Sequence, residues 1–228
     1  TIVSKTLMNN FFKILIFVLI SGVITFGIIF PIPFIPALGD KARVLYFHVP
    51  MSWISVLAFF MSMWYSIRYL KTRDSDFDVK SYSCAQLGFL FCILATATGS
   101  LWAKFNWGSF WNWDPRQTSI FILLMIYGAY FALRSAIDSE EQRAKLSSVY
   151  SILAAVTVPF FVFIMPRIVE SLHPDPIINN QGKINMDRGM FIIFITSLVG
   201  FTMLYFWILN LKIRLERLQI KKLKEITG

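Results

Sequence analysis

Six long apolar stretches alternate along the chain with shorter segments that are rich in charged, proline or aromatic residues. The stretches cover residues 14–30, 49–69, 83–103, 118–133, 146–165 and 190–211. A helix needs about 20 mainly apolar residues to cross roughly 30 Å of hydrocarbon, and we interpret each stretch as one such helix. The pattern predicts an all-α integral membrane protein, with a bundle of six transmembrane helices in a single membrane domain over residues 1–228.

The composition supports this interpretation. Hydrophobic types make up 56% of the residues and charged types only 15%, and the mean hydropathy of +0.61 is high for a water-soluble domain. A net charge of +9 would suggest a nucleic-acid partner for a soluble protein. In a membrane protein, this excess must first be compared with the distribution of basic residues between the two sides of the bilayer.

The basic residues are unevenly distributed between the polar segments. Because the number of spans is even, both termini lie on one side, together with the second and fourth connections. These segments hold 15 of the 22 Lys and Arg residues, and the other three connections hold 7. The positive-inside rule therefore predicts cytoplasmic termini and accounts for most of the excess charge. We expect the lipid bilayer to be the partner of the basic tail, and we expect no nucleic-acid partner.

Most of the unusual side chains fall in the three segments predicted to face outward, which are residues 31–48, 104–117 and 166–189. They carry prolines, amides, aromatic residues and both histidines of the chain. Four of the seven tryptophans lie close together, at Trp102, Trp107, Trp111 and Trp113. The residues alone leave two readings open, an aromatic belt at the headgroup layer and a platform for a flat aromatic ligand.

The run WGSFWNWDPRQT, from Trp107 to Thr118, resembles the tryptophan-rich signature of the haem-handling proteins of cytochrome c biogenesis. Among these proteins, a short chain with six spans is similar to the cytochrome c maturation protein C family. The resemblance extends over nearly the whole length of the chain. It implies that residues 104–117 form an outer, tryptophan-rich haem-binding loop, with Trp107, Trp111 and Trp113 contacting the haem.

The two histidines occupy positions that fit this resemblance. His48 opens the second span, and His173 follows the fifth, so both are predicted to lie on the same side as the tryptophans. Haem iron accepts two axial imidazoles, and imidazole is largely neutral near pH 7. We therefore predict that His48 and His173 are the axial ligands of a haem b. The sequence departs from the family pattern at Pro174, where a polar residue such as Gln is expected.

Three charged residues complete the predicted site. Haem propionates require charge-assisted donors near lipid, and Arg43 and Arg116 are the candidates because a guanidinium can bind a carboxylate through two hydrogen bonds. Contacts with lipid headgroups and a capping role near Thr118 are the alternative for both arginines. Asp114 is expected to accept a hydrogen bond from a loop amide or an arginine, since a carboxylate beside a propionate would repel it.

The resemblance implies a function in haem binding and haem delivery. The protein would hold haem on its outer face and load it onto a periplasmic haem chaperone. Its other partners would be the subunits of an ATP-binding-cassette (ABC) exporter and a small membrane subunit. The chain has no Walker motif, so any use of ATP belongs to another chain. We expect that the protein is not an enzyme. The alternative is that it promotes the covalent attachment of haem to the chaperone.

The sequence leaves other functions and locations open. A b-type membrane cytochrome for electron transfer is the main alternative, but such proteins hold haem between histidines on facing helices, and no His falls within the six stretches. A haem transporter would be expected to have ionisable residues inside its spans. A purely structural subunit would leave the tryptophans and histidines unexplained. The expected location is the bacterial inner membrane, with the mitochondrial inner membrane as the alternative.

The predicted topology can be tested with reporter fusions. Reporters placed after Lys71, after Glu140 and at Gly228 should report the cytoplasm, and one near Asn180 should report the opposite side, because the basic residues concentrate around the first three positions. A cytoplasmic signal from the Asn180 fusion would contradict the shared location of the histidines and the tryptophans.

Overall fold

The computed structural model describes residues 2–33, 38–173 and 186–227. Every regular element among them is helical. In chain order the elements are α1 (Ile2–Ile29), the 3-10 helix η1 (Gly39–Val44), α2 (Leu45–Thr72), α3 (Ser75–Trp107), α4 (Pro115–Ser135), α5 (Glu140–Pro159), the π-helical turn η2 (Phe160–Ile164), α6 (Met165–Ile168) and α7 (Arg188–Thr227). Six helical segments in these ranges are long and apolar enough to cross a membrane. The prediction of an all-α membrane protein with six spans is confirmed.

The helices are longer than the apolar stretches that predict them. The second candidate span covers Gly39–Thr72 and the third Ser75–Trp107, because helices continue into residues that hydropathy assigns to polar connections. As a result, His48 lies inside α2, one turn after its start. The segment 104–117 is helical at both ends, and only residues 108–114 lie between α3 and α4.

Local chemistry explains where these two helices meet the loop. α3 ends at Gly108, which has a φ of 81° and therefore closes the helix in the left-handed region that glycine favours. α4 begins with Asp114 as its cap, whose carboxylate accepts a hydrogen bond from the Arg116 backbone N–H, and with Pro115 at the first turn. These are ordinary stop and start signals on each side of the tryptophan-rich segment.

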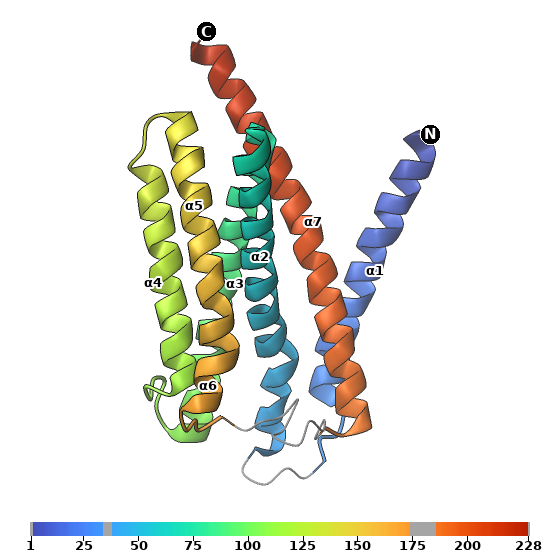
Figure 1. Cartoon of the computed structure of the whole chain (residues 1–228). Helices are drawn as coiled ribbons and strands as arrows, with labels where there is room; N and C mark the ends of the chain where they lie inside the picture. The colour runs from blue at the N-terminus through green and yellow to red at the C-terminus, as the bar shows by residue number, and fades with distance from the viewer. Residues whose placement is uncertain (1, 34–37, 174–185, 228) are drawn as a thin grey trace.

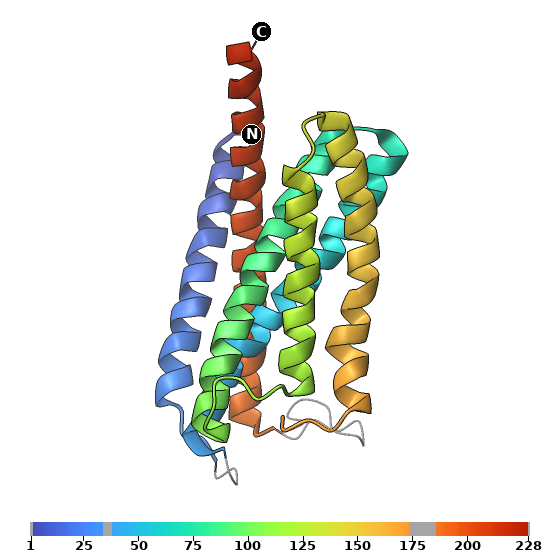
Figure 2. The same cartoon turned by 90° about the vertical axis from the view of Figure 1, so that its left-hand side faces the viewer.

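The bundle is built around α2, which packs against α3, α5 and α7. Figures 1 and 2 show α4 and α5 side by side, with α7 and α1 on the other side of the bundle. Both termini lie at one end of the molecule, and η1, the 108–114 loop and α6 lie at the opposite end (Figure 1). The elements that carry the predicted site residues are thus gathered at one end.

Small and aromatic side chains set the spacing of the central helices. Phe59 of α2 stacks on Tyr127 of α4, with ring centroids 3.5 Å apart. A buried serine cluster links α2, α3 and α5 through hydrogen bonds between the hydroxyl groups of Ser62, Ser81 and Ser151. Hydroxyl and glycine positions allow helix backbones to approach closely in a membrane, where apolar area alone gives little preference for helix over lipid.

The packing of Phe59 generates a stability prediction for Gly88 of α3. A Cβ atom at Gly88 would lie 2.7 Å from the Phe59 ring, so Gly88→Ala should destabilise the bundle by about 1–3 kcal/mol through overpacking. Gly128→Ala is the matched control, because nothing lies within 4 Å of its Cβ position. Thermal unfolding in detergent should show a lower midpoint for the first variant only. Equal midpoints would contradict the close packing of α2 and α3.

Candidate functional site

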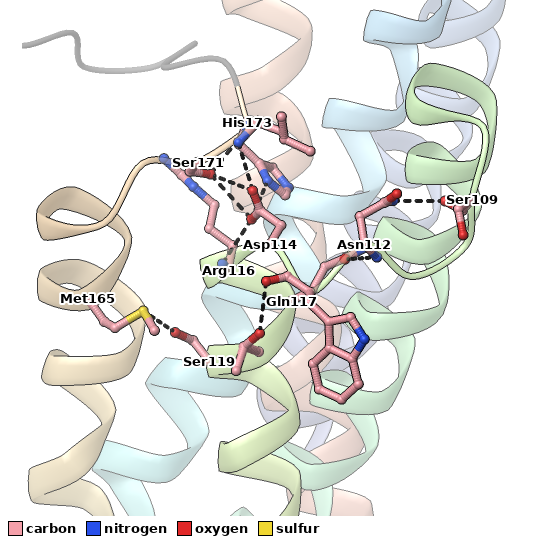
Figure 3. A network of polar contacts seen from close by, with 12 residues as sticks. Ser109, Asn112, Asp114, Arg116, Gln117, Ser119, Met165, Ser171 and His173 are labelled. Atoms are coloured by element: carbon pink, nitrogen blue, oxygen red, sulfur yellow. Dashed lines mark hydrogen bonds and ion pairs between the residues drawn. The ribbon is translucent and has the colours of Figure 1, made fainter.

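The loop 108–114 is held in shape by one buried amide side chain. The Gln117 side chain accepts a hydrogen bond from the backbone N–H of Asn112 at 2.8 Å and donates one to the carbonyl of Phe110 at 3.2 Å. The Asn112 side chain donates to the carbonyl of Ser109 at 3.1 Å (Figure 3). These bonds satisfy three backbone groups of an irregular segment at the membrane end, where an unpaired group is costly.

Asp114 is the centre of a polar network that joins two distant parts of the chain (Figure 3). Its side chain is fully buried. It accepts hydrogen bonds from the backbone N–H of Leu172 at 2.7 Å, from the Ser171 hydroxyl at 2.9 Å and from the Arg116 backbone N–H at 2.9 Å. His173 Nδ1 lies 3.0 Å from the same carboxylate. The sequence-based expectation of a hydrogen bond from a loop amide to Asp114 is confirmed.

The charge states of this network follow from the same contacts. Burial alone would raise the pKa of the Asp114 carboxyl, but hydrogen bonds from the Arg116 and Leu172 backbones, the nearby His173 and the Ser171 hydroxyl outweigh it and lower the pKa. Burial lowers the pKa of His173, although the Asp114 carboxylate acts to raise it. At neutral pH the pair is therefore a carboxylate and a neutral imidazole. The ring donates from Nδ1 to Asp114, which leaves the lone pair on Nε2.

Two tryptophans enclose the His173 ring, which is 17% exposed. Trp102 stacks on it with ring centroids 5.4 Å apart, and Trp107 meets it edge to face at 4.8 Å. The two indoles contact each other at 5.0 Å. Together these residues, Trp102, Trp107 and His173, form an aromatic group that fixes the plane of the imidazole.

His48 lies on α2, and its ring is also oriented by a hydrogen bond, in this case to a residue of the facing helix α3. Its Nδ1 lies 3.1 Å from the Thr98 hydroxyl oxygen. That hydroxyl already donates its hydrogen to the carbonyls of Leu94 and Ala95, so it accepts from His48. The ring also lies against Gly99, where a Cβ atom would come within 2.8 Å of it. His48 therefore donates from Nδ1 and, like His173, keeps its lone pair on Nε2.

The remaining tryptophans of the motif form a second, more exposed aromatic pair. Trp111 and Trp113 meet edge to face at 5.9 Å, and Trp111 also contacts Phe121 of α4. Trp113 is 71% exposed, and its φ of 55° is unusual for a bulky residue. Backbone strain of this kind persists only where the surroundings impose it, and it concentrates at functional sites.

The two arginines have different surroundings. Arg43 donates from Nη1 to the carbonyls of Gly27 and Phe30, at the end of α1, at 2.9 Å each. Its Nε and Nη2 atoms donate to Asp40. These contacts are those of a helix C-terminal cap. Arg116 lies beside Asp114 in the polar network (Figure 3), on the first turn of α4.

Among the described residues, two cavities lie at opposite ends of the bundle, and neither is lined by a histidine. The larger, of about 860 Å³, lies at the end where the termini are and is lined by charges of both signs, including Arg134 and Glu141. It contains none of the predicted site residues. The smaller, of about 250 Å³, lies at the opposite end and is lined by Arg43 and Trp102, among others. Arg43 thus borders the aromatic group through this cavity.

Several residues of this arrangement escape sequence reasoning. The sequence places Trp102 in the tryptophan cluster but not beside His173, and Thr98 and Ser171 act through contacts with residues at least fifty positions away. Gln117 lies within the run 107–118, but its role depends on the shape of the loop. The helical spacing of four residues between Thr98 and Trp102 is the one signal that could have placed them on a common face. Pro174, where the sequence departs from the family pattern, lies outside the described residues.

The polar network predicts a local effect of losing Asp114. Asp114→Ala removes the α4 cap, worth about 1 kcal/mol, and also the tether of residues 171–173. Ser139→Ala is the matched control, because Ser139 caps α5 at the other end of the bundle through Gln142. Amide hydrogen exchange should accelerate at Leu172 and His173 only in the Asp114 variant. Unchanged exchange there would contradict the tethering role.

Comparison with known proteins places the chain in a family. The sequence profile described as "Heme exporter protein C" matches residues 2–227. A protein with that name from Bradyrhizobium diazoefficiens is 29% identical over 73% of this chain, and the alignment spans 63% of that protein. One from Haemophilus influenzae is 28% identical over 85% of this chain, and the alignment spans 79% of that protein. A putative cytochrome c biosynthesis ccmC-like mitochondrial protein of Marchantia polymorpha is 33% identical over 55% of this chain and 52% of its own length. The chain belongs to the heme exporter protein C family.

Proposed function

We propose that the protein binds haem b at the end of the bundle opposite the termini and delivers it to a haem chaperone. The observation that carries this proposal is that both histidines have the same hydrogen-bonding arrangement at Nδ1. Nδ1 of each ring is occupied by an oxygen acceptor, Thr98 for His48 and Asp114 for His173. Each ring therefore keeps an Nε2 lone pair for a metal, which is the arrangement that oriented imidazole ligands require.

The other residues of the site fit a haem as well. A porphyrin is flat, aromatic and amphipathic, and the exposed ring of Trp113, supported by Trp111, offers it a stacking surface. We assign Trp107 to the placement of His173, which it contacts directly. Arg116 is our candidate for a propionate, because it lies within the polar network beside His173. We assign Arg43 a structural role, since its donors hold the end of α1.

Delivery, as opposed to permanent binding, is supported by the place of the site. The 108–114 loop, which carries Trp113, and α6, which precedes His173 in the sequence, lie at the end of the bundle (Figure 1), where a water-soluble partner can reach them. With the termini in the cytoplasm, this end faces the periplasm of a bacterial inner membrane or the equivalent side of the mitochondrial inner membrane. The receiving partner would then be a periplasmic haem chaperone. The ABC exporter subunits and a small membrane subunit would be the other partners in the system.

A b-type membrane cytochrome is the second candidate, and one observation favours it. His48 lies within α2, inside a candidate span. A histidine inside a span is what a b-type cytochrome requires, so the sequence-based argument against this function is weakened. His173, however, lies after α6 and is held by a loop network. An electron carrier would keep its haem when mixed with a chaperone, whereas a delivery protein would lose it.

The decisive experiment is purification of the full chain in detergent after expression with ample haem. A visible spectrum and a pyridine haemochrome assay should detect stoichiometric haem b. Incubation with a haem chaperone should then move the haem to the chaperone. Absence of haem would overturn the proposal, and bound haem that no chaperone removes would favour the cytochrome.

The axial assignment predicts the spectra of two variants. His48→Ala and His173→Ala should each convert a low-spin spectrum to a high-spin one, because one of two strong-field ligands is lost. Added imidazole should partly restore the low-spin form by filling the vacancy. Since the chain has two histidines in all, a bis-histidine spectrum that persists in both variants would exclude this assignment.

The exposed aromatic pair predicts a separate effect on haem affinity. Trp113→Ala should lower the affinity several-fold, because stacking is worth about 0.5–1.5 kcal/mol beyond area burial. Trp64→Ala is the control, since Trp64 is also an exposed tryptophan, at 59%, but lies on α2 outside the motif. Haem titration followed by tryptophan fluorescence quenching measures both variants. Equal affinities would favour the aromatic-belt interpretation of Trp113.

A further inference from the structure

The two histidines differ in the kind of group that holds their Nδ1 atoms. The partner of His173 is Asp114, a carboxylate whose side chain is fully buried. The partner of His48 is the hydroxyl of Thr98. One ring is thus hydrogen-bonded to an anion and the other to a neutral oxygen, at nearly equal distances of 3.0 and 3.1 Å.

The contacts of Asp114 favour the ionised form of its side chain. Its two oxygens face two backbone N–H groups, a hydroxyl and the His173 ring. The backbone N–H groups of Arg116 and Leu172 can only donate, one to each oxygen, and the hydroxyl and the ring can donate as well. Hydrogen bonds of this kind stabilise the carboxylate, which places a negative charge beside His173.

This difference changes how strongly each ring binds a metal. A carboxylate that accepts the Nδ1 hydrogen draws it partly away from the ring, and the electron density gained by the ring makes Nε2 a stronger donor. The Thr98 oxygen carries no charge, and its own hydrogen is already given to backbone carbonyls. It orients His48 but adds little to the basicity of its Nε2.

The surroundings of the rings act in the same direction. His173 is fixed by stacking with Trp102, by an edge contact with Trp107 and by the bond from the neighbouring Leu172 N–H to Asp114. His48 lies against Gly99 and is held by the Thr98 hydroxyl and by a hydrogen bond with the Ala95 backbone. The His173 ring is restrained by two indole rings in addition to its hydrogen bond with a carboxylate.

We propose that His48 is the axial ligand that a receiving partner displaces, and that His173 remains on the iron until the haem leaves. This inference rests on the proposed haem function. In the exchange, the bond between iron and His48 Nε2 breaks and its electron pair returns to the ring. One bond forms from the iron to a nitrogen or oxygen donor of the partner. The iron is neither oxidised nor reduced.

The presence of two histidines in all allows a direct test. The haem-loaded full chain, in the ferric state, is titrated with cyanide, which takes one axial position. The freed imidazole is then modified with diethyl pyrocarbonate and located by mass spectrometry. Modification of His48 should exceed that of His173 by about 10-fold or more, the range in which partners of metal ligands act. Equal modification, or preferential modification of His173, would overturn the inference.

Two variants test whether the charge of Asp114 causes cyanide to displace His48 in preference to His173. Asp114→Asn keeps the size of the side chain but removes its charge, so the preference should fall and the reduction potential of the haem should rise. Ser171→Ala is the matched control, since it removes a neighbouring hydroxyl and leaves the carboxylate charge in place. A preference that survives Asp114→Asn unchanged, or that is lost equally in Ser171→Ala, would contradict the role of the charge.

Thr98→Val provides an independent measurement if the Asp114 variant fails to fold. Valine has nearly the shape of threonine but cannot accept a hydrogen bond, so His48 should be displaced at a lower cyanide concentration. An unchanged concentration would contradict the role of Thr98.

A chain that binds no haem would overturn the proposed function itself, whereas bound bis-histidine haem with the opposite preference would overturn only this inference.

Discussion

The hydrogen-bonded carboxylate of Asp114 is the interaction on which the candidate site depends. It caps α4, accepts from the chain segment after α6 and orients His173. The last two of these contacts join elements that are more than fifty residues apart in the sequence. A buried charge is tolerated here because every donor that surrounds it contributes a hydrogen bond, which offsets the loss of hydration. The local shape of this end of the bundle follows from that requirement.

The aromatic residues around this carboxylate divide into two groups with different surroundings. Trp102 and Trp107 pack on an imidazole, so their rings are partly covered by protein. Trp113 projects from a backbone position that bulky residues rarely adopt and stays largely exposed. A single run of tryptophans in the sequence therefore serves two physical roles, the support of one side chain and the presentation of an open aromatic surface.

Hydropathy is sufficient to predict the six spans because the energetic cost of placing polar residues in hydrocarbon is large and local. It fails at the ends of the helices, where Gly108 and Asp114 set the boundaries and where a helix can continue into polar residues. His48 illustrates the result, since it lies inside α2 although it falls just outside the apolar stretch. The partners Thr98 and Ser171 could not be predicted, because they depend on which helices are neighbours. The turn η2, which follows Pro159 within the fifth span and precedes the His173 segment, also has no signature in periodicity.

The position of α1 has a consequence for the order of assembly in the membrane. Its main helix partner is α7, and the α7 backbone at Gly200 lies close to Leu19 and Ile20 of α1. Because α7 follows α1 by four long helices in the sequence, the main helix partner of α1 is synthesised well after it. Before α7 is inserted, α1 can be held by the hydrogen bonds from Arg43 to the carbonyls of Gly27 and Phe30. Individually stable helices allow this order, since insertion precedes helix association in a membrane.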